Sequence, residues 1–517
     1  MTLLASLVET SRRVAQTPSR LAKVEALAAL LRGLAPDEIE TAVAFLSGDT
    51  GRARLGIGYA TVRKVRESAA AQPTLSLAQV ESLLEELDAV GGKGSASGRS
   101  RLLAQLFGRA TETEQEFLAR LMTGELRQGA LEGVMLDAVA HAAGAAPAEV
   151  RRATMFAGDI RKVAAAVLGE GAEALGRFAL RVLQPVQPML AGSAEDVGSA
   201  LSQLGAAALE WKLDGARVQV HKSGDEVRVF SRSLKDVTAA VPEVVEGVRA
   251  AAAGQLILDG ETIALKAGGV PQPFQVTMRR FGRRLDVAQM RQALPLSVFF
   301  FDCLLRDDEV LADRAARDRF AALGEVLPPA LVVPRLVTDQ IAAARLFYDD
   351  ALRRGHEGIM AKALDAPYEA GSRGASWLKI KRVHTLDLVV LAAEWGSGRR
   401  RGWLSNLHLG ARDPAGGGFV MLGKTFKGMT DEILEWQTRE LLARETGRDA
   451  YTVHVRPELV VEIAFNDLQA SPHYPGGLAL RFARVKGYRP DKKAADADTI
   501  DAVRAIYQSQ VQREKAQ

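Results

Sequence analysis

The sequence predicts a multidomain α+β protein with an all-helical N-terminal domain, a central α/β domain and a C-terminal β-barrel. Its 517 residues exceed what one ordinary hydrophobic core can hold. The apolar pattern is helical through residues 1–182, mixed through 183–384, and made of short strand-like runs between glycine-rich turns through 385–517. Two prolines within residues 183–189 mark the first change of pattern. We therefore expect three domains with these bounds.

The composition is that of a globular protein with a weak excess of positive charge. Hydrophobic residues make up 47% and charged residues 25% of the chain. Lys and Arg total 67 against 63 Asp and Glu, which is weak evidence for a polyanionic partner, although residues 278–284 and 399–401 form denser basic clusters. The single Cys303 excludes an intramolecular disulfide and a CxxC zinc site. With no apolar run of membrane-spanning length and no signal peptide at residues 1–15, we expect a cytoplasmic protein without a membrane segment.

Helix signals recur through the N-terminal domain. Apolar residues repeat at helical spacing over 21–31, and Ser76 with Gln79 forms a capping-box pattern ahead of another helix. Two polar interruptions, residues 91–101 and 123–129, bring together glycines, hydroxyls and cations. Such residues suit close approach to a phosphate backbone, although a flexible loop between helices is the more ordinary interpretation.

The central domain is organised around residues 210–217, Glu-Trp-Lys-Leu-Asp-Gly-Ala-Arg. Lys212 precedes a Leu-Asp-Gly turn, and two alternating runs, 217–221 and 227–231, predict a β-hairpin after it. Lys212 would then lie at the mouth of a sheet. A lysine that is partly desolvated among other cations can act as a neutral amine and attack phosphorus. Taken alone, however, the lysine of a Lys-x-Asp-Gly pattern is more often a solvated surface residue than a nucleophile.

Further groups that a nucleophilic lysine would need follow in the same domain. An apolar strand delivers Asp259 and Glu261 at its end, where carboxylates suit a hard cation or a ribose hydroxyl. Phe301 lies in the run 299–302, which predicts a buried strand and could present an aromatic face to a base. Lys379 and Lys381 share one strand face that suits a triphosphate. Each has an ordinary structural interpretation, but together they fit nucleotidyl transfer better than any other chemistry.

One further motif does not fit its mechanism. Residues 418–425 match the Walker A pattern letter for letter. Their four central residues are Phe-Val-Met-Leu, which predict a strand, and no helix signal follows them. We therefore predict that no phosphate-binding loop forms there.

In their order along the chain, these stretches resemble the motif series of covalent nucleotidyltransferases and, more closely, of ATP-dependent DNA ligases. The resemblance rests on Lys212-Leu-Asp-Gly, Ser231-Arg232, Leu258–Glu261, Phe301-Asp302, Glu357–Lys362 and Trp377–Lys381. Residues 480–485 and 489–492 resemble the last motif of DNA ligases, which lies on an OB-fold domain. Residues 91–101 and 124–127 resemble the helical DNA-binding domain of larger archaeal and some bacterial ligases, with Gln128 where an apolar residue is expected.

The resemblance implies a role for each matched residue. Lys212 would be the catalytic nucleophile that attacks the α-phosphorus of ATP and forms lysyl-AMP. Glu210 would contact the adenine, Phe301 would stack on it, and Glu261 and Glu357 would help to bind Mg²⁺. The implied ligands of phosphates or ribose are Arg217, Arg232, Arg373, Lys379, Lys381, Arg481, Arg484 and Lys492. AMP would then pass to the 5′-phosphate of nicked double-stranded DNA, and the adjacent 3′-hydroxyl would displace it.

Several alternatives stay open at this point. An RNA ligase or an RNA-capping guanylyltransferase shares the core motifs, although the long helical region favours duplex DNA. A catalytically silent nucleic-acid-binding module is the alternative from another class, but such a protein has no use for this set of lysines and acids. We expect a monomer. The sequence leaves open a sliding clamp or repair factors as partners, Mg²⁺ against Mn²⁺, and a role in replication, repair or recombination.

Overall fold

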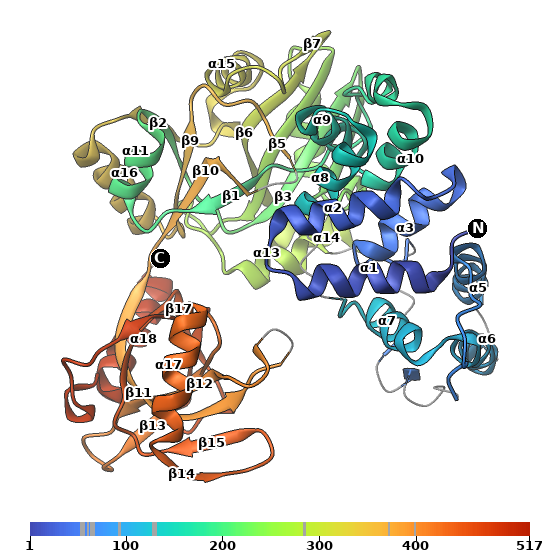
Figure 1. The fold of residues 1–517 in the computed structure, drawn as a ribbon. Helices are drawn as coiled ribbons and strands as arrows, with labels where there is room; N and C mark the ends of the chain where they lie inside the picture. Colours follow the sequence, from blue (N-terminus) through green and yellow to red (C-terminus); the bar gives the residue numbers. More distant parts are fainter. Residues whose placement is uncertain are drawn as a thin grey trace.

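The computed structural model describes residues 1–516 except 52–56, 59–60, 63–67, 91–94, 127–131, 283–285, 371–372 and 398–399. Figure 1 shows a helical N-terminal part, a central part built on two sheets, and a strand-rich C-terminal part. The predicted three-part α+β architecture is confirmed. Among the described helices, none combines the length and the apolar character that a membrane crossing requires.

The N-terminal part is helical in its described residues apart from an isolated bridge between Leu3 and Ser76. Its helices pack around one apolar core that includes Leu7, Leu27 and Phe45. They are α1 (Leu4–Gln16), α2 (Arg20–Leu31), η1 (Pro36–Glu38), α3 (Ile39–Leu46), α5 (Leu77–Ala89), α6 (Ser95–Arg109), α7 (Glu112–Thr123), α8 (Glu132–Ala143), α9 (Pro147–Ala157), α10 (Ile160–Glu170) and η2 (Ala172–Arg177).

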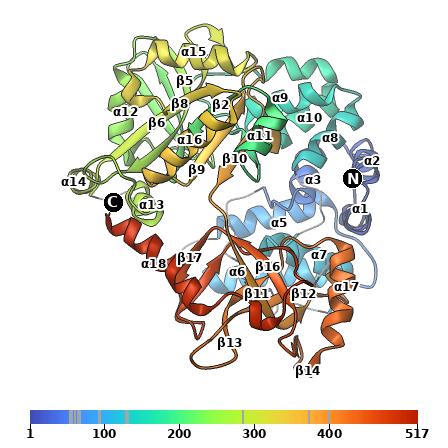
Figure 2. The same cartoon turned by 90° about the vertical axis from the view of Figure 1, so that its left-hand side faces the viewer.

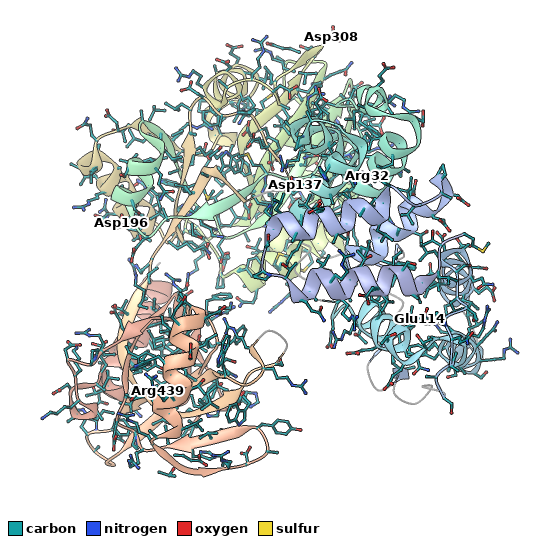
Figure 3. All side chains as sticks on the ribbon, in the orientation of Figure 1. Arg32, Glu114, Asp137, Asp196, Asp308 and Arg439 are labelled. Carbon is teal, nitrogen blue, oxygen red and sulfur yellow. The ribbon has the colours of Figure 1, made fainter. Side chains whose placement is uncertain are left out.

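Local signals set the ends of these helices. The Ser76 hydroxyl accepts the N–H of Gln79 at 3.3 Å, and the Gln79 side chain accepts the N–H of Ser76 at 3.2 Å, so the predicted capping box is confirmed. Gly124 ends α7 in the left-handed conformation at φ 71°, which favours glycine. Ion pairs at Asp137 (Figure 3) join α8 to α2 and α9, with Arg20 at 2.6 Å and Arg151 on the second oxygen.

The phosphate-suited loop predicted at residues 91–101 is wrong over residues 95–101. These residues form the first turns of α6, whose later residues bury an apolar face. That burial stabilises the helix even though serines and a glycine stand in its first turns. Residues 91–94 of this prediction, and residues 127–129 of the second interruption, lie outside the described part of the chain.

The central part contains two five-stranded sheets (Figure 1). In spatial order the first is β1 (Leu190–Ser193), β10 (Arg373–Lys381), β9 (Gly358–Ala363), β2 (Ala207–Trp211) and β8 (Arg335–Thr338). The second is β4 (Glu226–Ser231), β3 (Ala216–Ser223), β5 (Gln255–Ala264), β6 (Leu296–Arg306) and β7 (Glu309–Val310). The predicted hairpin is confirmed as β3 and β4, paired up to Ser223 and Glu226 around Gly224 at φ 59°.

Helices cover both sheets. Helices α11 (Val197–Leu204) and α16 (Ile341–Arg353) share an apolar core with the first sheet. Helices α12 (Pro242–Arg249) and α15 (Ala316–Val326) share a core with the second. The remaining helical segments are η3 (Thr238–Ala240), α13 (Phe274–Phe281), α14 (Val287–Ala293) and η4 (Pro329–Leu331).

The proline-rich residues 183–189, hereafter the strap, connect the helical part to the central part along one face of β3. Three residues of β3 at alternate positions contact the strap backbone, because alternate side chains of a strand point to the same face. The contacts are the Leu183 N–H to His221 Nδ1 at 3.0 Å, the Val186 N–H to Gln219 Oε1 at 2.8 Å, the Gln219 Nε2–H to the Val186 carbonyl at 3.2 Å, and Arg217 Nη1 to the Met189 carbonyl at 2.6 Å.

The C-terminal part begins where β10 leads through residues 382–383 into β11, a connection visible in Figures 1 and 2. Its elements are β11 (His384–Trp395), β12 (Leu404–Arg412), β13 (Phe419–Thr425), α17 (Asp431–Leu442), β14 (Glu445–Arg448), β15 (Thr452–Val455), β16 (Val460–Phe465), β17 (Asp467–Ala470), β18 (Leu478–Arg481), β19 (Arg484–Tyr488), η6 (Ala494–Asp496) and α18 (Ile500–Ala516). Strand β13 occupies the Walker A match, so the rejection of a phosphate-binding loop is confirmed.

The predicted strand-rich C-terminal domain is confirmed, but its described strands do not close into a complete barrel. Seven strands form one sheet that branches at β11, which pairs with β12 along one edge and with β15 and β16 along the other. The edge strand β13 has no ladder to β19. Two hydrogen bonds link the neighbouring segments, from the Val485 N–H to the Lys427 carbonyl at 2.9 Å and from the Thr425 hydroxyl to the Ala483 carbonyl at 2.6 Å. The sheet therefore curls toward closure without completing it.

Candidate functional site

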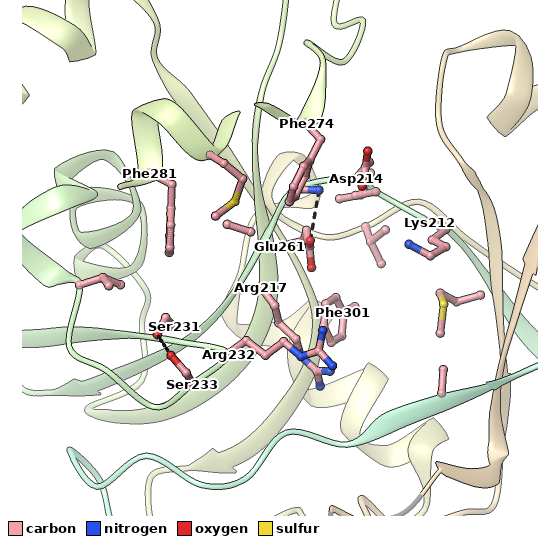
Figure 4. Close-up of a pocket in the computed structure, with 18 of the residues that line it drawn as sticks. Lys212, Asp214, Arg217, Ser231, Arg232, Ser233, Glu261, Phe274, Phe281 and Phe301 are labelled. Atoms are coloured by element: carbon pink, nitrogen blue, oxygen red, sulfur yellow. Dashed lines mark hydrogen bonds between the residues drawn. The ribbon is translucent and has the colours of Figure 1, made fainter. Parts of the chain in front are cut away.

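A cavity of about 1180 Å³ in the central part collects most of the predicted site residues (Figure 4). It is lined by segments from both sheets, by the turn after β4 and by α13. The predicted residues among its lining are Glu210, Lys212, Arg217, Arg232, Glu261, Phe301, Lys379 and Lys381. Residues far apart in the sequence thus meet at one site.

Lys212 directly follows β2 and is held by backbone and side-chain contacts. Its N–H donates to the Gly358 carbonyl at 2.9 Å, and its carbonyl accepts the N–H of Glu357 at 3.2 Å. Its ammonium lies 2.5 Å from Glu357 Oε2, which also lies 2.7 Å from the ammonium of Lys381. Burial would raise the pKa of Glu357, but these two cations outweigh burial and hold that pKa below its usual range. Lys212 thus faces both an acid and a second lysine.

The tight backbone at Gly358 makes this arrangement possible. Gly358 has a φ of 146°, and a Cβ built on it would lie 2.1 Å from the carbonyl oxygen of Ile380. A glycine is therefore required where β9 starts beside β10. The close approach of these two strands brings Glu357 and Lys381 to the same point.

Glu261 faces the cavity from the middle of β5, and not from the end of a strand as predicted. Strand β5 continues to Ala264, because apolar residues after Glu261 pack in the core. Glu261 Oε1 accepts the N–H of Gly215 at 3.2 Å (Figure 4). Burial raises the pKa of Glu261 to about 7 despite the nearby Lys212 and Arg217. Its carboxylate is therefore incompletely compensated by the protein.

Asp214 is a second cavity acid with a perturbed pKa, which the motif comparison did not assign to the site. Its pKa is raised by burial first and by the nearby Glu357 second. Only the local pattern Lys-Leu-Asp-Gly pointed to it. Asp214, Glu261 and Glu357 together place three acids around Lys212.

Phe301 lies in a layer of aromatic rings and cations that also lines the cavity. Its ring meets Trp377 edge to face at 5.9 Å between centroids, and the ammonium of Lys362 lies 4.4 Å from its centroid. Beneath it, the buried Glu210 accepts from Arg335 at 2.6–2.8 Å and from Lys362 at 2.7 Å. Arg335 was missed from the sequence. Its signal was a lone cation within the apolar run 331–337.

Arg217 is bound on most sides by protein groups. Its guanidinium pairs with the buried Asp259 through Nε at 3.0 Å and Nη2 at 2.6 Å, and Nη2 also contacts the Tyr368 hydroxyl at 3.2 Å. It lies 5.5 Å from the ring centroid of Phe301. Tyr368 was not singled out from the sequence, where nothing distinguishes it from an ordinary core tyrosine.

Five predicted residues are not part of the described cavity lining, and one of them, Glu357, still lies beside it through its contact with Lys212. Arg481 and Arg484 flank the β18–β19 turn of the C-terminal part, and Lys492 lies 2.5 Å from Asp387 in that part. The backbone of Arg373 begins β10, but its side chain lies outside the described set. Arg232, by contrast, does line the cavity, where its side chain is exposed.

Family models match three segments of the chain. Residues 188–381 match the ATP dependent DNA ligase domain, residues 400–492 match the ATP dependent DNA ligase C terminal region, and residues 59–140 match the DNA ligase N terminus. The first of these segments contains the whole cavity lining from Met189 to Lys381.

Curated relatives match over nearly the full length. The "Probable DNA ligase" of Anaeromyxobacter dehalogenans (strain 2CP-C) is 62% identical over 510 residues, which cover 98% of this chain and 99% of the relative. The "Probable DNA ligase" of Mycolicibacterium gilvum (strain PYR-GCK) is 56% identical and covers 98% and 99%. A solved structure titled "Pmar-Lig_Pre." has a TM-score of 0.60 at 20% identity, covers 94% of this chain and 99% of its own, and is similar in fold alone. The chain belongs to the family of ATP-dependent DNA ligases.

Proposed function

We propose that the protein seals nicks in double-stranded DNA through a lysyl-AMP intermediate on Lys212. The observation that carries this proposal is one cavity in which Lys212, Asp214, Glu261, Lys379, Lys381 and the aromatic layer of Phe301 meet, with Glu357 paired to Lys212 and Lys381. A binding module would have no use for a lysine held at this point.

Lys212 would attack the α-phosphorus of ATP. An N–P bond forms, the bond from the α-phosphorus to the bridging oxygen of pyrophosphate breaks, and pyrophosphate leaves. The lysine gives up a proton to water in this step, and Glu357 Oε2 at 2.5 Å orients its nitrogen. The 5′-phosphate of the nick then takes AMP from the lysine, and the 3′-hydroxyl attacks that phosphate and releases AMP.

Other cavity residues would bind and orient the nucleotide. Phe301 would stack on the adenine, with Glu210 at its edge. Lys379 and Lys381 would contact the α-phosphate region, and Arg217, Arg232 and Arg373 would contact phosphates or ribose. Arg481, Arg484 and Lys492 would reach the pyrophosphate only after the C-terminal part moves toward the cavity.

Glu261 and Glu357 fit a bound Mg²⁺. Mg²⁺ is a hard cation that takes one or two carboxylates together with substrate phosphates. The raised pKa of Glu261 indicates a carboxylate whose charge a cation would compensate. When bound, Mg²⁺ would offset the charge that builds on the transferring phosphoryl group.

The helical N-terminal part would bind the DNA. We propose domains at 1–182, 183–384 and 385–517, a monomeric enzyme, and a cytoplasmic location. Because phosphate contacts dominate such binding, we expect the affinity for a nicked duplex to fall steeply with salt. Sliding-clamp or repair-factor partners stay a prediction from the sequence.

Labelling tests the proposal. The protein is first stripped with pyrophosphate, incubated with Mg²⁺ and ATP labelled at the α-phosphate, and run on a denaturing gel. We expect a labelled band that disappears, with sealed product, when nicked duplex is added. Lys212→Ala should abolish the band, whereas Lys493→Ala, an exposed C-terminal lysine, should leave it unchanged. Retained label in Lys212→Ala would contradict the nucleophile assignment, and transfer of label to RNA ends alone would favour an RNA ligase.

A further inference from the structure

The strap ends at the nucleotide cavity, and its last contact is made to a residue that lines it. Met189 and Arg217 both line the cavity, and the Met189 carbonyl accepts from Arg217 Nη1 at 2.6 Å. Earlier contacts along β3 fix the strap at Val186 and Leu183. The backbone that enters from the helical part is therefore part of the support of Arg217.

The Tyr368 hydroxyl also helps to hold Arg217, and all of its hydrogen-bonding sites are used. It donates to Asp259 Oδ2 at 2.7 Å, accepts the N–H of Met189 at 3.0 Å, and accepts from Arg217 Nη2 at 3.2 Å. A hydroxyl offers one donor and two acceptor sites, so all three are used. Burial and the adjacent Asp259 raise the pKa of Tyr368 well above its usual value, which keeps the donating proton in place.

Arg217 has little freedom left under these contacts. A guanidinium carries five N–H donors. Within the described part of the chain, the Nε donor goes to Asp259, both Nη2 donors go to Asp259 and Tyr368, and one Nη1 donor goes to Met189. One Nη1 donor is left for a ligand in the cavity. A single donor cannot grip a phosphate in the two-pronged manner typical of arginine, but it suits one oxygen atom.

The position of Arg217 indicates which oxygen this is. Its guanidinium carbon lies 5.5 Å from the ring centroid of Phe301 and 5.7 Å from that of Trp377. If Phe301 stacks on the base, as the proposed function requires, the group bonded directly to the base comes next to Arg217. That group is the ribose.

We propose that Tyr368 is a positioning residue for the nucleotide, which it affects through Arg217. Its hydroxyl ties Asp259 and Arg217 to the strap backbone at Met189, so that the remaining N–H of Arg217 is presented to one ribose hydroxyl. The proposal rests on the proposed function, because it takes a nucleotide stacked on Phe301 as its premise.

The test uses the full chain and the variant Tyr368→Phe, which removes only the hydroxyl. Self-adenylylation is measured in single turnover against the concentration of labelled ATP, 2′-deoxy-ATP or 3′-deoxy-ATP. We expect the half-saturating ATP concentration to rise about ten-fold with little change in the maximal rate. With the deoxynucleotide that lacks the contacted hydroxyl, Tyr368→Phe and the wild type should have about the same half-saturating concentration. Tyr488→Phe is the matched control, since that half-buried hydroxyl donates to Gln437 Oε1 at 3.0 Å in the C-terminal part.

A second variant separates positioning from a general loss of structure. Arg217→Lys keeps the Tyr368 hydroxyl and should give the same dependence on the deoxynucleotides. Adding Tyr368→Phe to Arg217→Lys should change the half-saturating concentration less than two-fold, because the hydroxyl acts through Arg217. The inference would be overturned if Tyr368→Phe leaves the half-saturating concentration unchanged, or raises it equally for all three nucleotides. It would also be overturned if the effects of the two substitutions multiply in the double variant. A stripped wild-type protein that no nucleotide labels would refute the proposed function itself.

Discussion

Glu261 should make the central part less stable as the pH rises, and Glu261→Gln should remove this effect. The pKa of Glu261 is raised from 4.5 to about 7 in the folded protein, chiefly by burial. Below pH 4.5 the carboxyl is protonated in both folded and unfolded chains, so the substitution is neutral there. Between pH 4.5 and about pH 7, Glu261 is ionised in the unfolded chain but protonated in the folded one, so the folded state loses stability as the pH rises. Above about pH 7 the folded state bears the full cost of the buried charge.

The size of the effect follows from the shift. A shift of about 2.5 units corresponds to at most about 3 kcal/mol, at 1.36 kcal/mol per unit. Because the cavity leaves Glu261 partly exposed to water, we expect about 2 kcal/mol. A glutamine still accepts the N–H of Gly215, so the hydrogen bond to that turn is kept.

Thermal unfolding of the full chain without nucleotide or Mg²⁺ measures this effect. For a domain of this size, about 2 kcal/mol shifts Tm by roughly 4–8 °C. We expect Glu261→Gln to unfold at a higher temperature than wild type at pH 8 and at the same temperature at pH 4.5. Glu173→Gln, an exposed glutamate of η2, serves as the control and should be neutral at both pH values. A Glu261→Gln protein that is less stable at pH 8 would refute the reasoning.

Two further substitutions test the packing that supports the site. Arg319→Met should destabilise the central part by about 3–5 kcal/mol in thermal unfolding, because Asp302, at 2.7 Å from Arg319, would stay buried without its partner. Substituting the exposed Arg317 by Met should cost less than about 1 kcal/mol. Similar losses of stability in the two variants would contradict this view. Gly358→Ala should prevent folding of the central part or abolish lysine labelling, since its Cβ would collide with backbone, whereas Gly447→Ala, which has open space around it, should leave the yield of folded protein and its labelling unchanged.

The sequence predicted the site where chemistry depends on residue type and local spacing. Lys212 beside a turn, the β3–β4 hairpin, and Lys379 with Lys381 on one face of β10 all follow from short-range patterns. The three-part architecture likewise follows from changes in apolar periodicity, which extend over many residues and average out local exceptions.

Features that depend on tertiary contacts escaped the sequence. Glu261 lies within a long strand because later apolar residues find a core to pack in, which periodicity before Glu261 does not show. Residues 95–101 are helical because the rest of α6 buries an apolar face, although their own composition favours a loop. The support of Arg217 by Tyr368 joins residues 151 positions apart, and no local pattern encodes that pairing.

The strap also determines how this connection between two folded parts can change during divergence. The side chains of β3 contact it through amide and carbonyl groups, which every residue type except proline offers in the same way. These hydrogen bonds therefore survive any substitution that keeps a backbone N–H, and only the burial of Val186 and Met189 demands apolar side chains there. Loss or gain of one residue would break the hydrogen bonds themselves, since it would move the amides out of step with the alternate side chains of β3. In this connection, the hydrogen bonds constrain the length and the buried side chains constrain the sequence.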